Sequence, residues 1–430
     1  MQPCPESPPC IPKFASPATA PSLLAMLRHA IADPARAIPA SIYDEWSYAL
    51  PGPRSPLVIA EPDAVRAILL DPGATFGRNR PLRTLMRRAW GNGLAAAEGE
   101  SWAAQRRAAA PAFRPSAIAA AMPVMTAATR HAAERWPCGE SVDLQPALGR
   151  IVARIVLETL LSDARDWDSD AIAADIPEVM RDVARFGLLE VAPIPAAWLD
   201  RLRRTGRSDA EARLRRIARD IAARAPTEPH HLTALLRDVG PLADNLFGFM
   251  IAGFETSALG AAWALYLLAL HPDWQAAVRA EATDAPDDTT RPVARAVVQE
   301  ALRLYPPGPL LVRAATRETE LLGHRIRRGQ TVIIPVFAIH RHRRLWADPD
   351  RFDPGRFAPA GHYPRGAYLP FGAGPRLCIA AGFATAEIAT IVAGLVRDLH
   401  FTPTGAAPVV SLKVSTHSTT GLHVTAQPVA

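Results

Sequence analysis

The stretch FGAGPRLCIAA, residues 371–381, decides the fold of this 430-residue chain. Its one cysteine, Cys378, follows a loop with two glycines and a proline, and precedes an alanine-rich, helix-prone run. A cysteine in the first turn of a helix meets unpaired N–H groups and the positive end of the helix dipole, which favour the metal-binding thiolate. Glycines let the backbone approach a large flat group, and Arg376 suits an anionic group beside it. The stretch therefore predicts a thiolate metal site.

The composition, 49% hydrophobic and 21% charged, is that of a globular protein with a large core. The net charge is +6, and it comes almost entirely from arginine because Lys13 and Lys413 are the only lysines. Basic blocks with interleaved aromatic residues are absent from the sequence, so we predict no nucleic-acid partner. A local basic face that docks an acidic protein partner stays open.

The four cysteines, Cys4, Cys10, Cys138 and Cys378, have the spacing of neither a zinc site nor a disulfide framework. A reducing cytoplasm is therefore the predicted location. The N-terminus has no basic region followed by a long apolar run, so no signal peptide is predicted. Residues 1–40 are proline-rich and are predicted to be a mobile segment, with a single domain at 41–430.

Residues 246–270, LFGFMIAGFETSALGAAWALYLLAL, are long and apolar enough to cross a membrane. However, Glu255 lies near the centre of this segment, and an acidic residue in mid-membrane is costly. A helix that is apolar all round is equally typical of the centre of a large globular protein. We therefore predict a central core helix and no integral membrane segment.

Helical patterns dominate the rest of the chain, and strand patterns are short. Strands are predicted in PLVIA (56–60), in three runs between 310 and 339, and in a hairpin near the C-terminus. The arginine-rich residues 76–93 are predicted to be irregular. The run HRHRRLWADPDRF, which contains His340 and His342, is predicted to lie at the surface without binding a metal.

The loop around Cys378 resembles that of the haem-thiolate monooxygenases, the cytochrome P-450 family, in which a cysteine thiolate holds the haem iron. The family signature is Phe-x-x-Gly-x-Arg-x-Cys-x-Gly. Phe371, Gly374, Arg376 and Cys378 match it, and Ala380 stands where the last glycine is expected. An inert buried cysteine is the alternative for this loop taken alone.

The resemblance implies a mainly α fold, with a large helical lobe and a small β-rich lobe. It also implies that haem b (iron protoporphyrin IX) is the cofactor and that Cys378 is the ligand of its iron. Phe371, Gly372, Arg376 and Ala380 would surround the haem. The methyl group of Ala380 is expected to shift the haem or the helix slightly without loss of binding.

Two further arginine positions match the family's haem-binding residues. Trp102 and Arg106 lie four residues apart, on one face of a predicted helix. The resemblance implies that this pair donates hydrogen bonds to one haem propionate, and that Arg313 binds the second. Packing together with a solvated charge is the alternative for the Trp–Arg pair.

A third motif, Glu300-x-x-Arg303, matches a pair that the family uses in a buried ion-pair network. Arg356, in DPGRF, is the candidate third member, although Gly355 stands where the family prefers an acidic residue. The network would hold the cysteine loop, and breaking such a buried pair commonly costs about 3–5 kcal/mol. A surface pair is the alternative, but Glu300 lies in an apolar stretch.

The central apolar segment carries a fourth motif, Ala-Gly-Phe-Glu-Thr-Ser at 252–257. The Thr256 hydroxyl is expected to bond back to a carbonyl within the helix and to loosen it locally. Glu255 would relay protons from solvent, and Gly253 would leave space over the iron. A buried Glu–Thr pair in an apolar helix requires a partner or a function.

Together these motifs imply an enzyme that inserts one atom of O2 into a small apolar organic substrate, by hydroxylation or epoxidation. Electrons would come from a separate ferredoxin or flavodoxin and its reductase, for which Arg107 and Arg114 are candidate docking charges. An H2O2-using peroxygenase of the same fold and a non-catalytic haem-binding or sensor protein are the alternatives. The Glu255–Thr256 pair argues against both.

The substrate itself is not specified by the sequence. Arginines at 78, 80, 83, 87 and 88 flank a region that often lines the pocket in this family, so a carboxylate-bearing substrate is one hypothesis. Residues 186–202, apolar and broken by prolines, are interpreted either as part of a lid over the substrate channel or as a hydrophobic loop packed on the core.

Overall fold

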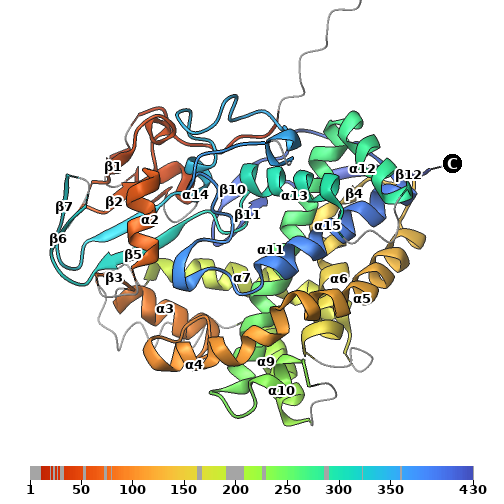
Figure 1. Cartoon of the computed structure of the whole chain (residues 1–430), viewed down its shortest axis with the longest axis horizontal. Coiled ribbons are helices and arrows are strands. Elements are labelled where there is room, and N and C mark those ends of the chain that lie inside the picture. Colours follow the sequence, from red (N-terminus) through yellow and green to blue (C-terminus); the bar gives the residue numbers. More distant parts are fainter. Residues whose placement is uncertain are drawn as a thin grey trace, which may run out of the picture.

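The computed structural model describes residues 11–429, apart from 20, 23–24, 27, 30–32, 52–54, 72–74, 79, 162–166, 190–207, 225–228, 285–289, 322 and 359–360. The described chain is mainly helical, with a smaller β-rich part (Figure 1). This confirms the predicted large helical lobe and small β lobe. The proposed lid at 186–202 falls mostly outside the described residues.

The helices are α2 (Pro62–Leu70), α3 (Arg80–Trp90), α4 (Gly99–Ala109), α5 (Pro115–Glu134), α6 (Leu144–Val156), α7 (Ser169–Leu189), α9 (Asp209–Ala223), α10 (Leu232–Leu235), α11 (Leu242–Leu270), α12 (Pro272–Asp284), α13 (Pro292–Leu304), α14 (Val336–Ile339) and α15 (Ala381–Asp398). The strands are β1 (Ser47–Ala49), β2 (Leu57–Ile59), β3 (Phe76–Gly77), β4 (Val142–Asp143), β5 (Leu311–Ala315), β6 (Thr319–Leu321), β7 (His324–Ile326), β8 (Thr331–Ile334), β9 (Leu399–Pro403), β10 (Val410–Leu412), β11 (Thr416–Ser418) and β12 (His423–Pro428).

The largest sheet has the strand order β1-β2-β8-β5-β3, and only its β2–β8 pair is parallel. It lies at one side of the molecule, with most helices at the other side (Figure 1). Strands β4, β12 and β9 form a second sheet, and β6–β7 and β10–β11 are separate hairpins. The predicted C-terminal hairpin is thus present as β10–β11, whereas the following strand, β12, joins another sheet.

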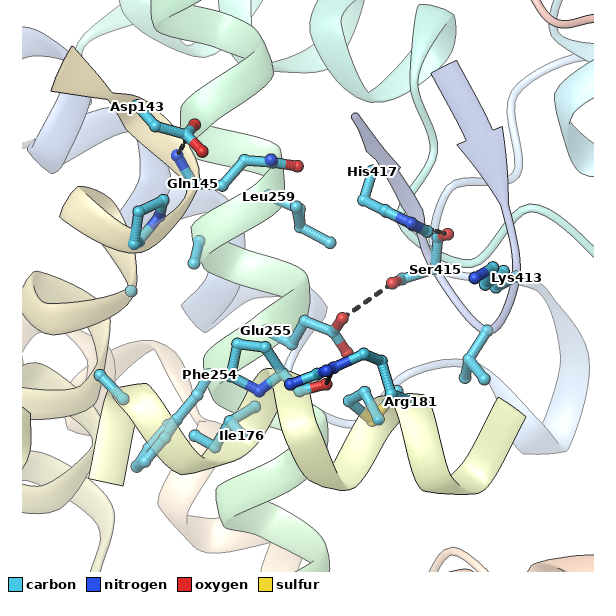
Figure 2. Close-up of a pocket in the computed structure, with 17 residues that line it drawn as sticks. Asp143, Gln145, Ile176, Arg181, Phe254, Glu255, Leu259, Lys413, Ser415 and His417 are labelled. Carbon is cyan, nitrogen blue, oxygen red and sulfur yellow. Dashed lines mark hydrogen bonds between the residues drawn. The ribbon is translucent and has the colours of Figure 1, made fainter. Parts of the chain in front are cut away.

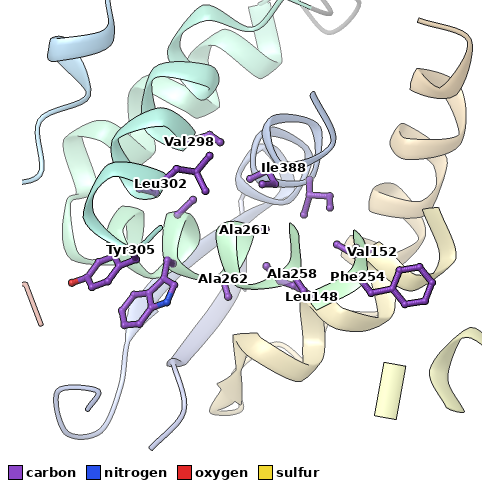
Figure 3. Packing of buried hydrophobic residues seen from close by; sticks show 14 of the residues in the cluster. Leu148, Val152, Phe254, Ala258, Ala261, Ala262, Val298, Leu302, Tyr305 and Ile388 are labelled. Carbon is purple, nitrogen blue, oxygen red and sulfur yellow. The ribbon is translucent and has the colours of Figure 1, made fainter. Parts of the chain in front are cut away.

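Helix α11 is the centre of the helical part. It packs against α6, α9, α13 and α15, and nearly all of its second half is buried (Figure 3). Helix α11 approaches α15 closely at Gly260, because a Cβ there would lie 2.9 Å from Ile388 of α15. Among the described residues α11 is the one helix long and apolar enough to span a membrane, but 78% of its most apolar window is buried inside the protein. It is a core helix, as predicted.

The N-terminal segment packs where it is described. Ile11 and Phe14 are buried, and the Pro12 carbonyl accepts a hydrogen bond from the Tyr305 hydroxyl at 2.7 Å. Residues 1–10, 20, 23–24, 27 and 30–32 lie outside the description, and the mobility expected of residues 1–40 stays a prediction. Buried hydrophobic residues from Ile11 to Ala426 form one cluster, which is what the proposed single domain requires.

Two local predictions were wrong. Residues 80–90, predicted to be irregular, form α3, because Leu82, Leu85, Met86 and Ala89 recur at helical spacing among the arginines. The strand predicted through 331–339 ends before Pro335, and the four residues after this proline form the buried turn α14.

Candidate functional site

The cysteine loop closes on itself. The Cys378 amide donates a hydrogen bond to the Phe371 carbonyl at 3.0 Å, and α15 begins three residues after the cysteine. Gly374 has φ +71°, and a Cβ there would lie 2.0 Å from the Leu69 carbonyl oxygen at the end of α2. The backbone that this glycine approaches is therefore α2, which the sequence could not identify.

The Cys378 side chain faces a cavity of about 230 Å³. Gly248, Phe249 and Ala252 of α11 line it, as do Trp102 and Arg106 of α4. Burial raises the pKa of the Cys378 thiol, and the Ala380 N–H and the Arg106 charge offset only part of this rise. Burial thus opposes the thiolate that the helix N-terminus favours. A bound metal would displace the thiol proton.

Two arginines, one on α4 and one in the cysteine loop, connect the loop to α4 and to the segment that precedes it. Arg106 donates a hydrogen bond from Nη1 to the Leu377 carbonyl at 2.7 Å. Arg376 donates one to the Ala97 carbonyl at 2.9 Å, and its guanidinium lies 4.2 Å from the centre of the Trp102 ring. Burial, followed by the charge of Arg78, lowers the pKa of Arg376 to about 10.

The four guanidinium groups of Arg78, Arg106, Arg313 and Arg376 lie close enough to repel one another. Burial and the Arg78 charge lower the pKa of Arg313, and all three other arginines lower that of Arg376. Nη1 of Arg78 is buried and makes no hydrogen bond among the described residues. The charge of Glu98 offsets part of this repulsion at Arg78 and Arg376, and the two propionates of a haem would offset the rest beside the thiol.

Arg78 was grouped in the sequence with four other arginines as a candidate carboxylate binder. It lines the Cys378 cavity, whereas Arg83 and Arg87 of α3 are exposed and Arg83 pairs with Glu98 at 3.4 Å. The side chain of Arg80 is not described. No local pattern separates Arg78 from the rest, because its burial depends on contacts with distant segments.

The fourth motif, residues 252–257, lies in α11 and begins with Ala252, which lines the Cys378 cavity. The Thr256 hydroxyl donates to the Ala252 carbonyl at 2.7 Å, which confirms the predicted back-bond. The helix nevertheless stays α-helical throughout this turn. Gly253 is not among the residues that line this cavity, and a Cβ there would contact Val156 of α6 at 3.8 Å; its place over the iron stays a prediction. It lies about 100° around the helix from Ala252, and Ala252 and Gly248 line the cavity instead.

Glu255 faces a second cavity, of about 400 Å³, between α6, α7, α11 and the β10–β11 hairpin (Figure 2). Its Oε1 accepts a hydrogen bond from the Ser415 hydroxyl at 2.9 Å, and its buried Oε2 has no hydrogen-bond partner among the described residues. Burial raises the pKa of Glu255 to about 7, although the Ser415 hydrogen bond opposes this rise. The carboxyl therefore exchanges a proton near neutral pH, as a relay requires.

The predicted ion-pair network is present. Arg303 donates to both carboxylate oxygens of Glu300, at 2.6 and 2.7 Å, and both side chains are fully buried. Arg356 approaches Glu300 at 3.5 Å, which confirms it as the third member. The Glu300 carboxylate also accepts the Asp353 amide at 2.9 Å, so the absence of an acidic residue at Gly355 does not prevent the contact.

The link from this network to the cysteine loop is His340, which the sequence analysis placed at the surface. His340 is fully buried; its Nε2 accepts the Leu369 amide at 2.7 Å, and its Nδ1 lies 3.1 Å from the Arg303 carbonyl oxygen. Burial and the Arg303 charge lower its pKa to about 3, so the ring is neutral. No group of three or more candidate metal ligands occurs among the described residues.

Glu387 of α15 is a second residue that the sequence analysis missed. It is buried in the core nine positions after Cys378, and burial raises its pKa to about 8, an effect that Ser257 of α11 partly offsets. The only signal was an acidic residue at a core position of an apolar helix. Glu387 lies on the helix that follows the cysteine loop, where this helix packs against the helix of the Thr256 motif.

Comparisons with known proteins agree with this geometry. The family model described as "Cytochrome P450" matches residues 42–221 and 235–422. Cyclooctat-9-en-7-ol 5-monooxygenase of Streptomyces melanosporofaciens is 31% identical over 82% of this chain and 81% of that protein. The chloroplastic protein LUTEIN DEFICIENT 5 of Arabidopsis thaliana is 29% identical over 87% of this chain and 70% of its own length.

Solved structures share the fold. CYP175A1 from Thermus thermophillus superposes with a TM-score of 0.72 and 26% identity, over 90% of this chain and 92% of that one. The cytochrome P450DA heme domain superposes with a TM-score of 0.74 over 90% of both chains, and at 22% identity it is similar in fold alone.

Proposed function

The chain belongs to the cytochrome P450 family and is a haem b monooxygenase, and from this premise we propose that Cys378 is the thiolate ligand of its haem iron. The observation that carries this proposal is the position of Cys378 in one cavity with Arg78, Arg106 and Arg376, and Arg313 lies close enough to lower the pKa of Arg376. A thiol beside several guanidinium groups, of which Arg78 has a buried Nη1 without a hydrogen-bond partner among the described residues, matches the iron and the two propionates of one haem.

Each residue around the cavity has a proposed part in holding this group. Cys378 would bind iron through sulfur, and the Ala380 N–H and Arg106 would stabilise its negative charge. Arg78, Arg313 and Arg376 would hold the propionates with Arg106, and Trp102 would support Arg376 by stacking. Phe371 and Gly372 shape the loop. The bound haem would supply the iron that activates O2, with the thiolate favouring O–O cleavage.

Proton delivery is assigned to the fourth motif. The Thr256 hydroxyl donates its hydrogen to the carbonyl of Ala252, a residue that lines the Cys378 cavity, and its oxygen keeps lone pairs that could accept from a proton donor. Glu255 lies next to it in the chain but faces the second cavity, where its pKa near 7 suits repeated loss and uptake of a proton. The two residues would pass protons across α11 from that cavity.

The proposed substrate is a small apolar organic molecule. Glycine, alanine and phenylalanine of α11 line the cavity that contains Cys378, and Trp90 and Leu94 add further apolar surface. The similar Streptomyces protein is named for the 5-monooxygenation of cyclooctat-9-en-7-ol, an unsaturated alcohol. We therefore propose an unsaturated hydrocarbon or its alcohol as the substrate class, with hydroxylation or epoxidation as the reaction.

The proposed electron source is a separate ferredoxin or flavodoxin with its reductase, in the cytoplasm. Arg107 on α4 and Arg114 at the start of α5 are both exposed, and these helices adjoin the cysteine loop and α15. Exposed arginines suit an acidic electron carrier because opposite charges speed association.

The oxygen source separates this proposal from a peroxygenase and from a haem sensor. The test incubates the enzyme with candidate substrates under ¹⁸O2, using reduced ferredoxin in one arm and unlabelled H2O2 in the other. We expect one ¹⁸O atom in the product of the ferredoxin arm. Equal or faster product formation with H2O2 alone would favour the peroxygenase, and no product in either arm would favour the sensor.

A further inference from the structure

Two neighbouring residues, Thr416 and Ser415, connect the β10–β11 hairpin to the rest of the protein. The contacts of Thr416 hold the hairpin in place. The Thr416 hydroxyl donates to the Pro306 carbonyl at 2.6 Å, and the Thr416 carbonyl accepts the Trp263 indole N–H at 3.3 Å. All of these groups are buried. The hairpin therefore stays against α11 without any contribution from the neighbouring residue, Ser415.

The second connection is the hydrogen bond from the Ser415 hydroxyl to Glu255. Ser415 is 4% exposed, and its carbonyl accepts the Lys413 amide at 3.3 Å and lies 3.2 Å from Nδ1 of His417. These contacts fix the backbone of Ser415, and its hydroxyl points toward the carboxyl group of Glu255 (Figure 2). One oxygen of Glu255 is held, and the other is left without a partner among the described residues.

Other charged groups also border this cavity, but they do not bond to Glu255 within the described part of the chain. Arg181 of α7 and Lys413 of the hairpin are exposed lining residues, and Asp143 precedes α6 and caps it. His417 is held neutral, because burial lowers its pKa. Ser415 is thus the only described side chain that fixes the direction of the Glu255 carboxyl.

We infer that Ser415 is a positioning residue for Glu255: its hydroxyl holds Oε1 and thereby fixes the orientation of the carboxyl group at the border of the second cavity. This inference rests on the proposed function, in which Glu255 supplies the protons that O2 reduction consumes. Without the hydroxyl, the carboxyl would rotate freely and lose a donor that stabilises its charged form. The pKa of Glu255 would then rise, and proton delivery would be slower relative to electron transfer, so that less product would form per O2 consumed.

The test compares Ser415→Ala, Ser415→Thr and Thr419→Ala in the haem-loaded enzyme. Thr keeps the hydroxyl, and Thr419 is an exposed hydroxyl residue on the same hairpin that makes no contact with Glu255. Infrared difference spectra across pH would follow the C=O stretch of the protonated Glu255, assigned by its loss in Glu255→Gln. Product formed per O2 consumed would be measured on the same samples.

In Ser415→Ala we expect the Glu255 pKa to rise above about 7 and the product yield per O2 to fall by about tenfold, less than the loss from removing a whole relay residue. Ser415→Thr and Thr419→Ala should stay near the wild type. An unchanged pKa or an unchanged yield in Ser415→Ala would overturn the inference. A wild type that lacks the thiolate-type spectrum with CO would instead refute the proposed function.

Discussion

Replacing His340 with alanine tests whether the ion-pair network holds the cysteine loop. The substitution leaves two buried groups without partners, the Leu369 N–H and the Arg303 carbonyl. Each unsatisfied group costs about 1–3 kcal/mol, and the lost ring adds a cavity. We therefore expect a loss of about 3–5 kcal/mol in the free energy of unfolding.

The size of the thermal shift follows from the length of the chain. An unfolding entropy of about 2.1 cal/mol/K per residue gives about 0.9 kcal/mol/K for 430 residues. The expected decrease in the melting temperature is then about 3–6 °C. Because Leu369 lies two residues before Phe371, the variant should also lose haem faster to an acceptor protein such as apomyoglobin.

His342→Ala is the matched control. His342 is also fully buried, but it stacks on Trp46 at 4.3 Å and hydrogen-bonds to the Glu45 carbonyl, away from the cysteine loop. It should lower the melting temperature without speeding haem loss. Equal rates of haem loss in the two variants, or a destabilisation by His340→Ala below about 1 kcal/mol, would refute the role of His340.

Three other substitutions have definite expected outcomes. Gly374→Ala should prevent stable haem incorporation, because the new Cβ would collide with the Leu69 carbonyl. Gly405 has a similar φ but open space around it, so Gly405→Ala should lower the free energy of unfolding by only about 1 kcal/mol, as measured by thermal unfolding. Arg78→Gln should weaken haem retention by about tenfold or more, because a hydrogen bond to a charged group contributes about 1.5–3 kcal/mol; the exposed Arg87→Gln should not. Glu387→Gln should change the pH dependence of stability. In the wild type the folded-state pKa of Glu387, near 8, exceeds the unfolded value of 4.5. Its buried carboxylate therefore destabilises the wild type increasingly as pH rises between these two values. Denaturant titrations should show the wild type losing up to about 1.4 kcal/mol per pH unit relative to this variant, and parallel curves would contradict the assignment.

The sequence predicted those parts of the site that depend on short spacing. Thr256 reaches the carbonyl four residues earlier because helical geometry brings them together, and Glu300 meets Arg303 for the same reason. Arg356 was also found, although it is far away in the chain, because its own motif marked it. The mainly α fold followed from the long apolar helix and the order of the motifs.

What the sequence could not specify depends on contacts between distant segments. Ser415 meets Glu255 across 160 residues, and no local pattern distinguishes it from its neighbours. His340 lies in a run of charged residues that is typical of a surface, yet the packing around it makes it the link to Leu369. The motif at 252–257 fixes the order of its residues but not which face of α11 meets the cavity, so the sequence did not single out Gly248 and Ala252 as the lining residues.

The absorption spectrum of the reduced, CO-bound protein tests the ligation by Cys378 most directly. The wild type should show the red-shifted haem band of a thiolate ligand, because Cys378 is the described cysteine that lines the arginine-rich cavity. Cys378→Ser should abolish this band, whereas Cys138→Ser, at an exposed cysteine elsewhere, should leave it unchanged. A red-shifted band that persists in Cys378→Ser would contradict the assignment.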